Sequence, residues 1–208
     1  MHGDAGNDAL DGGSGVDTAD YSTATSAVSV SLTWEIASGD GLASLIGIEH
    51  VIGSVFNDEL YGRNDVNDRL EGGHGDDQLY GFGGDDFLIG GDGNDRLVTG
   101  RGGDTATGGA GSDTFVVQAA FFDSGSTAIT DFNAIEDRIE LEAGMAGQST
   151  LAVLRVGSSA ASANDRVIYD NQSGELFYDP DGNGSVEQTQ IGNIGAGQTL
   201  TDLNFILI

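Results

Sequence analysis

The sequence contains no cysteine, no lysine and a single proline among its 208 residues. The lack of cysteine excludes a disulfide framework and thiol catalysis. Only seven arginines oppose 34 acidic residues, and the formal net charge is −27. A nucleic-acid-binding surface needs the opposite sign, and an anionic membrane surface would repel this chain. There is no run of 18 apolar residues and no visible N-terminal signal peptide, so no membrane insertion is expected.

Glycine, by contrast, accounts for 35 residues and is concentrated in five consecutive nine-residue units between Gly72 and Val116. Acidity alone would also fit a disordered or salt-adapted chain, but neither explains acidic residues at fixed repeat positions. In every unit the fourth place is glycine, the sixth is aspartate and the eighth is apolar. The units read GGHGDDQLY, GFGGDDFLI, GGDGNDRLV, TGRGGDTAT and GGAGSDTFV, with the aspartates Asp77, Asp86, Asp95, Asp104 and Asp113.

This spacing predicts a stack of turns and short strands. Glycine suits turn positions with positive φ or close backbone approach, and a three-residue strand buries one inward side chain, the apolar eighth residue. Two units then form one coil, and neighbouring coils lie about 4.8 Å apart. We therefore expect an all-β fold, a right-handed parallel β-roll, in which each sixth-place aspartate lies near the aspartate two units further on.

Such a row of carboxylates indicates a cation site. Two carboxylates at about 4 Å repel by about 4 kcal/mol at an intermediate effective dielectric. A hard divalent cation with six or more oxygen ligands turns this repulsion into bridging, and turn carbonyls can supply the remaining oxygens. Magnesium is less suitable, because it requires rigid octahedral geometry and keeps its water. The sequence thus predicts Ca²⁺ as the cofactor, with about four to eight ions per chain.

The aspartate register continues upstream in less regular form. Phe56 and Val66 replace the fourth-place glycine of two units, the second unit is framed from Arg63, and Gly62 is then one extra residue between them. We expect these turns to bind more weakly or to be distorted. The sixth-place residues of the irregular frames are Asp8 and Asp17, which have no regular turn two units further on, and Asp58 and Asp68.

These repeats resemble the RTX (repeats-in-toxin) family, most closely the C-terminal part of serralysin-type proteases and other type I secretion substrates. The resemblance implies that each ion takes the second and fourth carbonyls and the aspartate of one turn, and the first and third carbonyls and the aspartate of the turn two units later. It also implies that Asp58 pairs with Asp77, and Asp68 with Asp86. The implied ligand sets are Gly73, Gly75, Asp77, Gly90, Asp92 and Asp95; Phe82, Gly84, Asp86, Thr99, Arg101 and Asp104; and Gly91, Gly93, Asp95, Gly108, Ala110 and Asp113, with Gly111 as the fourth-place glycine of the last turn.

The nonapeptides lapse at about residues 21–52. Residues 27–34 alternate as a half-buried strand, residues 38–41 form a loop, and residues 45–52 return to the roll. We expect this segment to prolong the roll with longer strands, and we assign Trp34 to the core or its rim. The chain opens within a repeat, whereas a repeat array usually has a capping element, so we also expect an upstream region.

The sequence changes character after Val117. Residues 129–141 resemble the segment that follows the last repeat in serralysin-like domains, and strands are expected at 151–156, 166–169 and 175–178. The prediction is a parallel β-roll over residues 1–117 and an antiparallel β cap over residues 118–208. The cap would cover the open end of the roll and shield its strand edges.

Two further segments of the cap carry motifs. Asp179, Asp181 and Asn183 alternate as in the first half of an EF-hand loop, which makes them a possible extra metal site. The twelfth position is Gln190 rather than a bidentate glutamate and flanking helices are not evident, so a tight turn is favoured. The chain ends in an acidic residue and a hydrophobic tail, which resembles an uncleaved type I secretion signal and also suits a last strand: Asp202, Phe205, Ile206, Leu207 and Ile208.

No catalytic constellation is evident in the sequence. The three histidines, His2, His50 and His74, form no HExxH motif, and no serine is flanked by glycine at both −2 and +2. Paired acidic residues are expected in a calcium array and cannot nominate a glycosidase. We expect a non-catalytic chain, although an upstream region could be a secreted hydrolase.

Two functions fit these observations. The first is a calcium-binding module that folds outside the cell, supports secretion through a type I ABC transporter and remains a monomer. Extracellular calcium modules bind at about 10⁻⁴ to 10⁻³ M, so the repeats would stay unfolded in the cytosol. The alternative is a calcium-dependent adhesin or a surface-layer or biofilm protein, which would self-associate with calcium.

Overall fold

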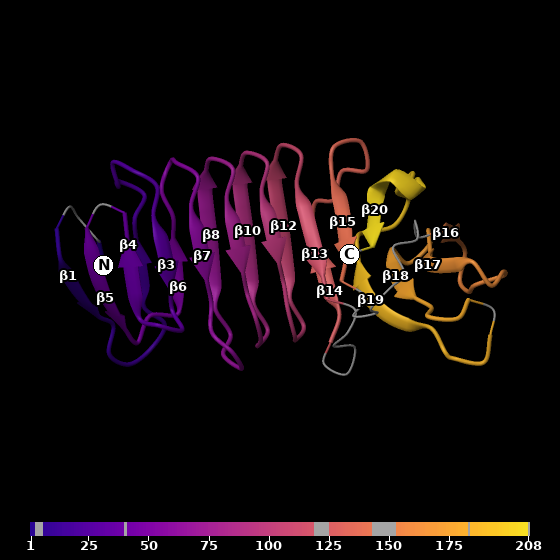
Figure 1. The fold of residues 1–208 in the computed structure, drawn as a ribbon, viewed down its shortest axis with the longest axis horizontal. Coiled ribbons are helices and arrows are strands. Elements are labelled where there is room, and N and C mark those ends of the chain that lie inside the picture. The colour runs from indigo at the N-terminus through magenta and orange to yellow at the C-terminus, as the bar shows by residue number, and fades with distance from the viewer. Residues whose placement is uncertain (3–5, 40, 119–124, 143–152, 183, 208) are drawn as a thin grey trace.

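Two ten-stranded sheets face each other in the computed structural model, which describes residues 1–2, 6–39, 41–118, 125–142, 153–182 and 184–207. Coils stack along the long axis from the N-terminal end to the orange and yellow cap (Figure 1). The first sheet has the order β1 (Asp8–Asp11), β5 (Leu42–Ile46), β4 (Ile36–Ser38), β3 (Ser29–Ser31), β7 (Glu59–Tyr61), β9 (Gln78–Tyr80), β11 (Arg96–Val98), β13 (Thr114–Val117), β15 (Arg138–Leu141) and β20 (Phe205–Leu207). The second sheet has the order β16 (Val153–Val156), β17 (Asp165–Tyr169), β18 (Glu175–Tyr178), β19 (Thr189–Asn193), β14 (Thr127–Ile129), β12 (Thr105–Ala110), β10 (Phe87–Asp92), β8 (Arg69–His74), β6 (His50–Ile52) and β2 (Thr18–Asp20).

The two-unit step of the repeat is the step between neighbouring strands. Leu88 of β10 pairs with Leu70 of β8 and with Ala106 of β12, and both ladders are parallel. Successive units alternate between the two sheets, so every eighth-place side chain points into the space between them. These residues are buried without exception: Leu60, Leu70, Leu79, Leu88, Leu97, Ala106 and Phe115. The predicted parallel β-roll is therefore confirmed.

The segment at residues 21–52 departs from the expectation. It forms strands of three to five residues rather than longer ones, and β4 runs antiparallel to both neighbours, β3 and β5. Trp34 lies in the turn between β3 and β4 with 75% of its surface exposed. Its assignment to the core or rim was wrong, because the strand alternation ends at Leu32, before the chain reverses.

Beyond Val117 both sheets continue. β14 and β15 pair in parallel with β12 and β13, and β20 extends the first sheet beyond β15. The antiparallel part of the expected cap is present as β17, β18 and β19, while β16 joins β17 in parallel. The roll is thus continued by two more strands before the antiparallel strands complete the second sheet. Among the described residues, the one short helix is a 3₁₀ turn, η2 (Asp202–Asn204). The described part of the chain has no helix that is long and apolar enough to cross a membrane.

Candidate calcium sites in the turns

Each sixth-place aspartate from Asp58 to Asp113 is the last residue of a turn, directly before a strand. In a solvated turn a carboxylate would point outward, but here the stacked coils enclose it. The side chains form two columns, one along each edge of the roll, and their residues are at most 2% exposed: Asp58, Asp77, Asp95 and Asp113 in the first column, and Asp68, Asp86 and Asp104 in the second. A row of buried carboxylates needs compensation from hydrogen bonds or a cation.

One carboxylate oxygen of each column aspartate, except Asp58 and Asp68, accepts a hydrogen bond from another member of its column. The backbone N–H of Asp77 donates to Oδ1 of Asp95 at 2.8 Å, and the N–H of Asp95 donates to Oδ1 of Asp113 at 3.0 Å. In the second column the N–H of Asp86 donates to Oδ1 of Asp104 at 3.0 Å. The structure therefore brings together the partners expected from the two-unit step.

The other carboxylate oxygen has no such partner. In the described part of the chain, Oδ2 of Asp77, Asp86, Asp95 and Asp104 is buried without a hydrogen bond. Each lies near a carbonyl of the next coil, since a Cβ at Gly72 would lie 2.2 Å from Asp77 Oδ2 and 2.7 Å from the Gly90 carbonyl oxygen. The unpartnered oxygens of Asp77, Asp86 and Asp95 thus border spaces that a glycine, Gly72, Gly81 or Gly90, leaves open.

The donor set in these spaces consists of oxygen atoms alone, which suits a hard cation such as Ca²⁺. Among the described residues, no group of three or more His, Cys, Asp or Glu side chains could hold a metal. Carbonyl ligands are therefore needed beside the aspartates. The third-place carbonyl of Asp92 accepts a hydrogen bond from the Gly75 N–H at 2.9 Å, and its second lone pair is left for an ion.

Burial raises the pKa of the column aspartates, and neighbouring carboxylates add to the effect. The pKa rises from the ordinary 3.8 to about 7 for Asp77, Asp86 and Asp95, with burial as the largest cause. It rises to about 6 for Asp104 and Asp113 for the same first reason. Each of these carboxylates therefore favours a proton, or another positive charge, near neutral pH.

Second-place and fourth-place residues of the regular turns adopt positive φ, as in Gly73 (112°) and Gly75 (115°). Phe82 holds the second place of its turn at φ 69° although it carries a side chain. This conformation disfavours L-residues with a Cβ, so glycine is the common choice. In these turns Oδ2 of Asp77, Asp86, Asp95 and Asp104 receives no hydrogen bond from the second-place N–H of the same turn.

Gly91→Ala is expected to prevent regular stacking of the coils. A Cβ at Gly91 would lie 1.9 Å from the Gly73 carbonyl oxygen, whereas real Cβ contacts under 3.0 Å are essentially unknown. The variant should gain little β signal in circular dichroism at calcium concentrations that saturate the natural chain. Gly103→Ala is the matched control, because its Cβ would meet the nearest atom at 3.4 Å. Equal calcium-dependent folding of both variants would contradict this packing.

Two upstream turns are closed by their own N–H groups. Ser54 donates its N–H to Asp58 Oδ2 and its hydroxyl to Asp58 Oδ1, at 2.8 Å for the hydroxyl. Arg63 donates its N–H to Asp68 Oδ2 at 2.7 Å. The expected pairs are in place, since the N–H of Asp58 donates to Asp77 Oδ1 at 2.7 Å, and that of Asp68 to Asp86 Oδ1 at 2.8 Å. Both oxygens of the Asp58 carboxylate and Oδ2 of Asp68 nevertheless already accept hydrogen bonds from Ser54 and Arg63 of their own turns.

The framing of the second irregular unit from Arg63 was wrong. Gly62 occupies the first place, because its N–H donates to the Tyr80 carbonyl in the same way as that of Gly81 donates to Val98. The extra residue lies inside the turn, where Asp65 takes the left-handed conformation (φ 60°). Sequence spacing alone could not place the insertion, because strand pairing decides which glycine begins the turn.

The two earliest aspartates border the same edges of the roll. Oδ2 of Asp8 and of Asp17 is buried without a hydrogen bond in the described structure. Asp17 faces Glu49, whose carboxylate accepts the Asp17 N–H at 3.2 Å, and a Cβ at Gly12 would lie 2.1 Å from the Gly47 carbonyl oxygen. As the sequence indicates, neither of the two has a regular turn two units further on.

Sequence reasoning missed two members of the columns. Asp137 ends the first column, where it accepts the Asp113 N–H at 3.0 Å, and burial raises its pKa. The sequence feature that could have identified Asp137 is its position two residues before the apolar Ile139, although this unit has no glycine. Glu49 enters the second column because β6 pairs with β2 and β8, which puts it in register with Asp17 and Asp68.

A second ladder of hydrogen bonds runs along the exposed fifth places, which the sequence analysis did not single out. The N–H of Asn94 donates to Asp76 Oδ1 at 2.8 Å, and the N–H of Ser112 donates to Asn94 Oδ1 at 3.0 Å. On the other edge, the N–H of Asp85 donates to Asn67 Oδ1 at 2.8 Å. The recurrence of Asn or Asp directly before the sixth-place aspartate was the available signal. These bonds hold successive turns in register.

The EF-hand-like segment forms a self-bonded turn in its described part. Asp181 Oδ2 accepts the N–H groups of Ser185 at 2.9 Å and Val186 at 3.1 Å, and Asp179 Oδ1 accepts the Asp181 N–H at 3.2 Å. Asn183 lies outside the described residues, so the possible metal site stays a prediction. Oδ1 of Asp181 is buried without a hydrogen bond in the described structure, and the tight turn stays a prediction as well.

The C-terminal residues continue the fold. Asp202 is exposed and accepts the Leu154 N–H at 2.9 Å. Phe205 is buried, and β20 pairs with β15 through Phe205, Ile206 and Leu207, as the alternative of a last strand predicts. Ile208 lies outside the described residues. A secretion role for these residues stays a prediction.

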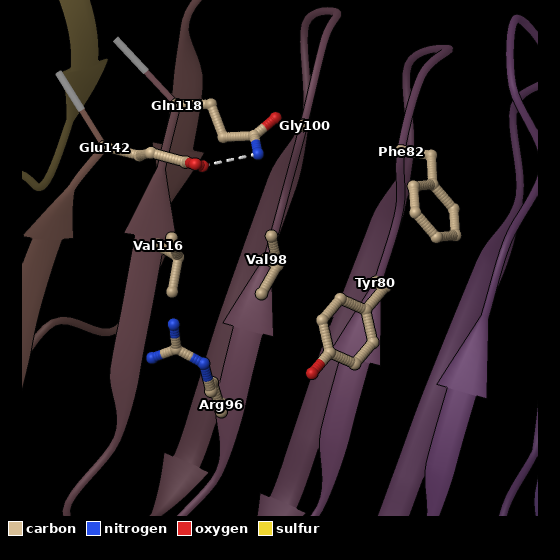
Figure 2. A pocket seen from close by; sticks show the side chains of 8 residues that line it. All are labelled: Tyr80, Phe82, Arg96, Val98, Gly100, Val116, Gln118 and Glu142. Carbon is tan, nitrogen blue, oxygen red and sulfur yellow. Dashed lines mark hydrogen bonds between the residues drawn. The ribbon is translucent and has the colours of Figure 1, made fainter. Parts of the chain in front are cut away.

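A surface pocket of about 280 Å³ lies on the outer face of the first sheet, away from the aspartate columns. Tyr80 stacks on Tyr61 of the neighbouring strand with ring centroids 4.9 Å apart, which stabilises the pairing of β7 with β9. The Gln118 amide donates to Glu142 at 2.7 Å across the pocket. Figure 2 shows the lining residues Tyr80, Phe82, Arg96, Val98, Gly100, Val116, Gln118 and Glu142.

Comparison with known proteins identifies the repeats. A family model of the RTX calcium-binding nonapeptide repeat matches in four copies, at residues 1–19, 64–97 and 89–117. No curated protein matches the chain. The AlgE6R3 subunit of the Azotobacter vinelandii mannuronan C5-epimerase is 23% identical, over 74% of this chain and 80% of that subunit, with a TM-score of 0.33. The AlgE6R2 subunit of the same enzyme is 26% identical, over 75% and 91%, with a TM-score of 0.34.

The extracellular lipase LipA from Serratia marcescens is 14% identical over 100% of this chain and 38% of the lipase, with a TM-score of 0.29. The family match covers the turns of Asp77, Asp86, Asp95, Asp104 and Asp113, which lie in the two columns. Those turns present buried carboxylate and carbonyl oxygens to one another at the two-unit step. The repeats of this chain are therefore RTX calcium-binding nonapeptide repeats, folded as a parallel β-roll.

Proposed function

We propose that this chain is a non-catalytic module that folds when calcium enters the turns of its roll. The observation that carries the proposal is the set of buried, unpartnered Oδ2 atoms of Asp77, Asp86, Asp95 and Asp104. Between two coils, an ion would receive two carboxylates and four carbonyls. There are three such ligand sets. Their two carboxylates come from the pairs Asp77–Asp95, Asp86–Asp104 and Asp95–Asp113.

Calcium would act on a chain that cannot compensate its own charge. The formal net charge is −27, and seven arginines are available for 34 acidic residues. Without ions the column carboxylates repel each other, and buried charges without partners are costly. Binding to the folded state alone makes folding and calcium binding a single event.

We place this event outside the cell. Extracellular calcium modules bind at about 10⁻⁴ to 10⁻³ M, far above the free calcium of the cytosol. The chain would remain expanded inside the cell, which suits passage through a type I ABC transporter with its C-terminal residues as the signal. Folding on the outside would prevent return and would stabilise the larger extracellular protein to which the module belongs.

Asparagine substitutions at Asp95 and Asp104 test the proposed sites. Asp95 belongs to two ligand sets and Asp104 to one, so Asp95→Asn should remove two ions per chain and Asp104→Asn one. Flow dialysis with radioactive calcium counts the ions bound at saturation. Asp85→Asn is the control, because Asp85 is exposed and its Oδ1 accepts the Gly103 N–H at 2.8 Å outside the columns. Equal counts for all three variants would refute the assignment.

A further inference from the structure

The backbone at the second place divides the turns of this roll into two kinds. In the regular turns the second-place residue has positive φ, as in Gly73, Phe82 and Gly91, and the aspartate of the turn is open. Ser54 and Arg63 hold the same place without positive φ, and each donates its N–H to the aspartate of its own turn. The aspartates of these closed turns have no unpartnered buried oxygen.

Arg63 adds a positive charge to its closed turn. Its Nη2 lies 2.6 Å from Asp68 Oδ1 and its Nε 3.2 Å from the same oxygen. The Asp68 side chain is 0% exposed, and that of Arg63 is 23% exposed. Nη2 also lies 3.5 Å from Glu49 Oε1, so one guanidinium serves two members of the second column.

The turn that holds Arg63 is one at which the repeat would otherwise form a calcium site. In the two-unit scheme an ion between Asp68 and Asp86 requires a free Asp68 carboxylate and the second-place carbonyl of its turn. Here both oxygens of Asp68 are bonded by Arg63, and the second-place backbone is not in the required conformation. The planar guanidinium of arginine presents its N–H donors in a fixed geometry that matches the two oxygens of a carboxylate.

We propose that Arg63 is a built-in cation that compensates the Asp68 carboxylate in place of calcium, so that the regular calcium array begins at the turn of Asp77. This inference rests on the proposed calcium function. A tethered cation cannot dissociate, so this coil keeps its compensation when calcium is absent. The coil of Asp68 would then be a calcium-independent template on which the open turns stack.

Counting bound ions in Asp68→Asn and Asp77→Asn tests the proposal in the full chain. Flow dialysis should show that Asp68→Asn binds as many ions as the natural chain, whereas Asp77→Asn binds one fewer. Arg69→Gln removes a positive charge from the same coil but from the outer face of the sheet, where Arg69 bonds Glu71 at 2.7 Å, and should leave the count unchanged. Loss of one ion from Asp68→Asn would overturn the proposal.

A rebuilt turn isolates the arginine from the extra residue. Deleting Asp65 and replacing Val66 with glycine restores a six-residue turn that retains Arg63, and this variant should keep the natural ion count. Adding Arg63→Gly to it should raise the count by one. A gain in both rebuilt variants, or in neither, would overturn the proposal. If a rebuilt variant does not fold in calcium, as judged by circular dichroism, Asp68→Asn decides alone. A natural chain that binds no calcium refutes the proposed function instead.

Discussion

Removal of calcium at neutral pH is expected to abolish most of the β-structure of this chain. The circular dichroism of the natural chain should show a cooperative gain of β signal as calcium rises to about 10 mM, and its loss when a chelator is added. The physical reason lies in the columns, where Asp77, Asp86, Asp95 and Asp104 each hold a buried oxygen without a partner.

The expected size of this effect follows from linkage. An ion at 100 times its dissociation constant stabilises the folded state by about 2.7 kcal/mol, and three such sites together contribute about 8 kcal/mol. A typical domain is stable by about 5 to 15 kcal/mol in total. The stabilisation that calcium provides in the three open sites is therefore comparable to the whole free energy of unfolding. Loss of calcium should shift the population from folded to unfolded.

Magnesium at equal concentration is the control for this measurement, since it fits flexible multi-oxygen sites poorly. Light scattering on the same samples separates the two functions that the sequence allows. A constant monomer mass agrees with the secretion and folding module, and a mass that grows with calcium favours the adhesive or surface-layer alternative. A chain that remains fully folded in the chelator would rule out the calcium-switch mechanism while leaving the β-roll intact.

Acidification is expected to restore part of the β-structure of the calcium-free chain. The pKa of Asp77, Asp86 and Asp95 rises from 3.8 to about 7 in the folded state, because burial disfavours the charged form. The folded state therefore binds more protons than the unfolded state between these values. Its stabilisation is complete below the unfolded pKa and is lost as pH rises through the folded pKa. The free energy of unfolding without calcium should fall from about pH 4 to about pH 7.

The measurement compares calcium-depleted chain at about pH 5 and about pH 8 by circular dichroism and urea unfolding. The β signal and the urea midpoint should both be higher at the lower pH. With calcium present the dependence reverses, because protons compete with the ion for the same carboxylates, so the apparent affinity should weaken on acidification. Asp95→Asn should flatten the pH dependence, and an unchanged dependence in this variant would contradict the assignment.

The sequence by itself determined the repetitive part of this protein. The eighth-place leucines are buried and the sixth-place aspartates form columns because stacking puts residues two units apart, which is one coil, into register. Leu88 meets Leu70 and Ala106 in the ladder for that reason alone. The parallel β-roll and the expectation of calcium follow from a period that is visible without coordinates, and the repeat family follows from the resemblance that this period carries.

Only the tertiary structure decided what happens where the period is broken. Glu49 and Asp137 join the columns because strand pairing, not spacing, puts them in register. Trp34 is exposed because β4 reverses direction there. Arg63 meets Asp68 because the turn holds an extra residue and a closed backbone. Each of these outcomes depends on contacts between residues distant in sequence or on a backbone conformation, and a sequence pattern encodes neither at a single irregular position.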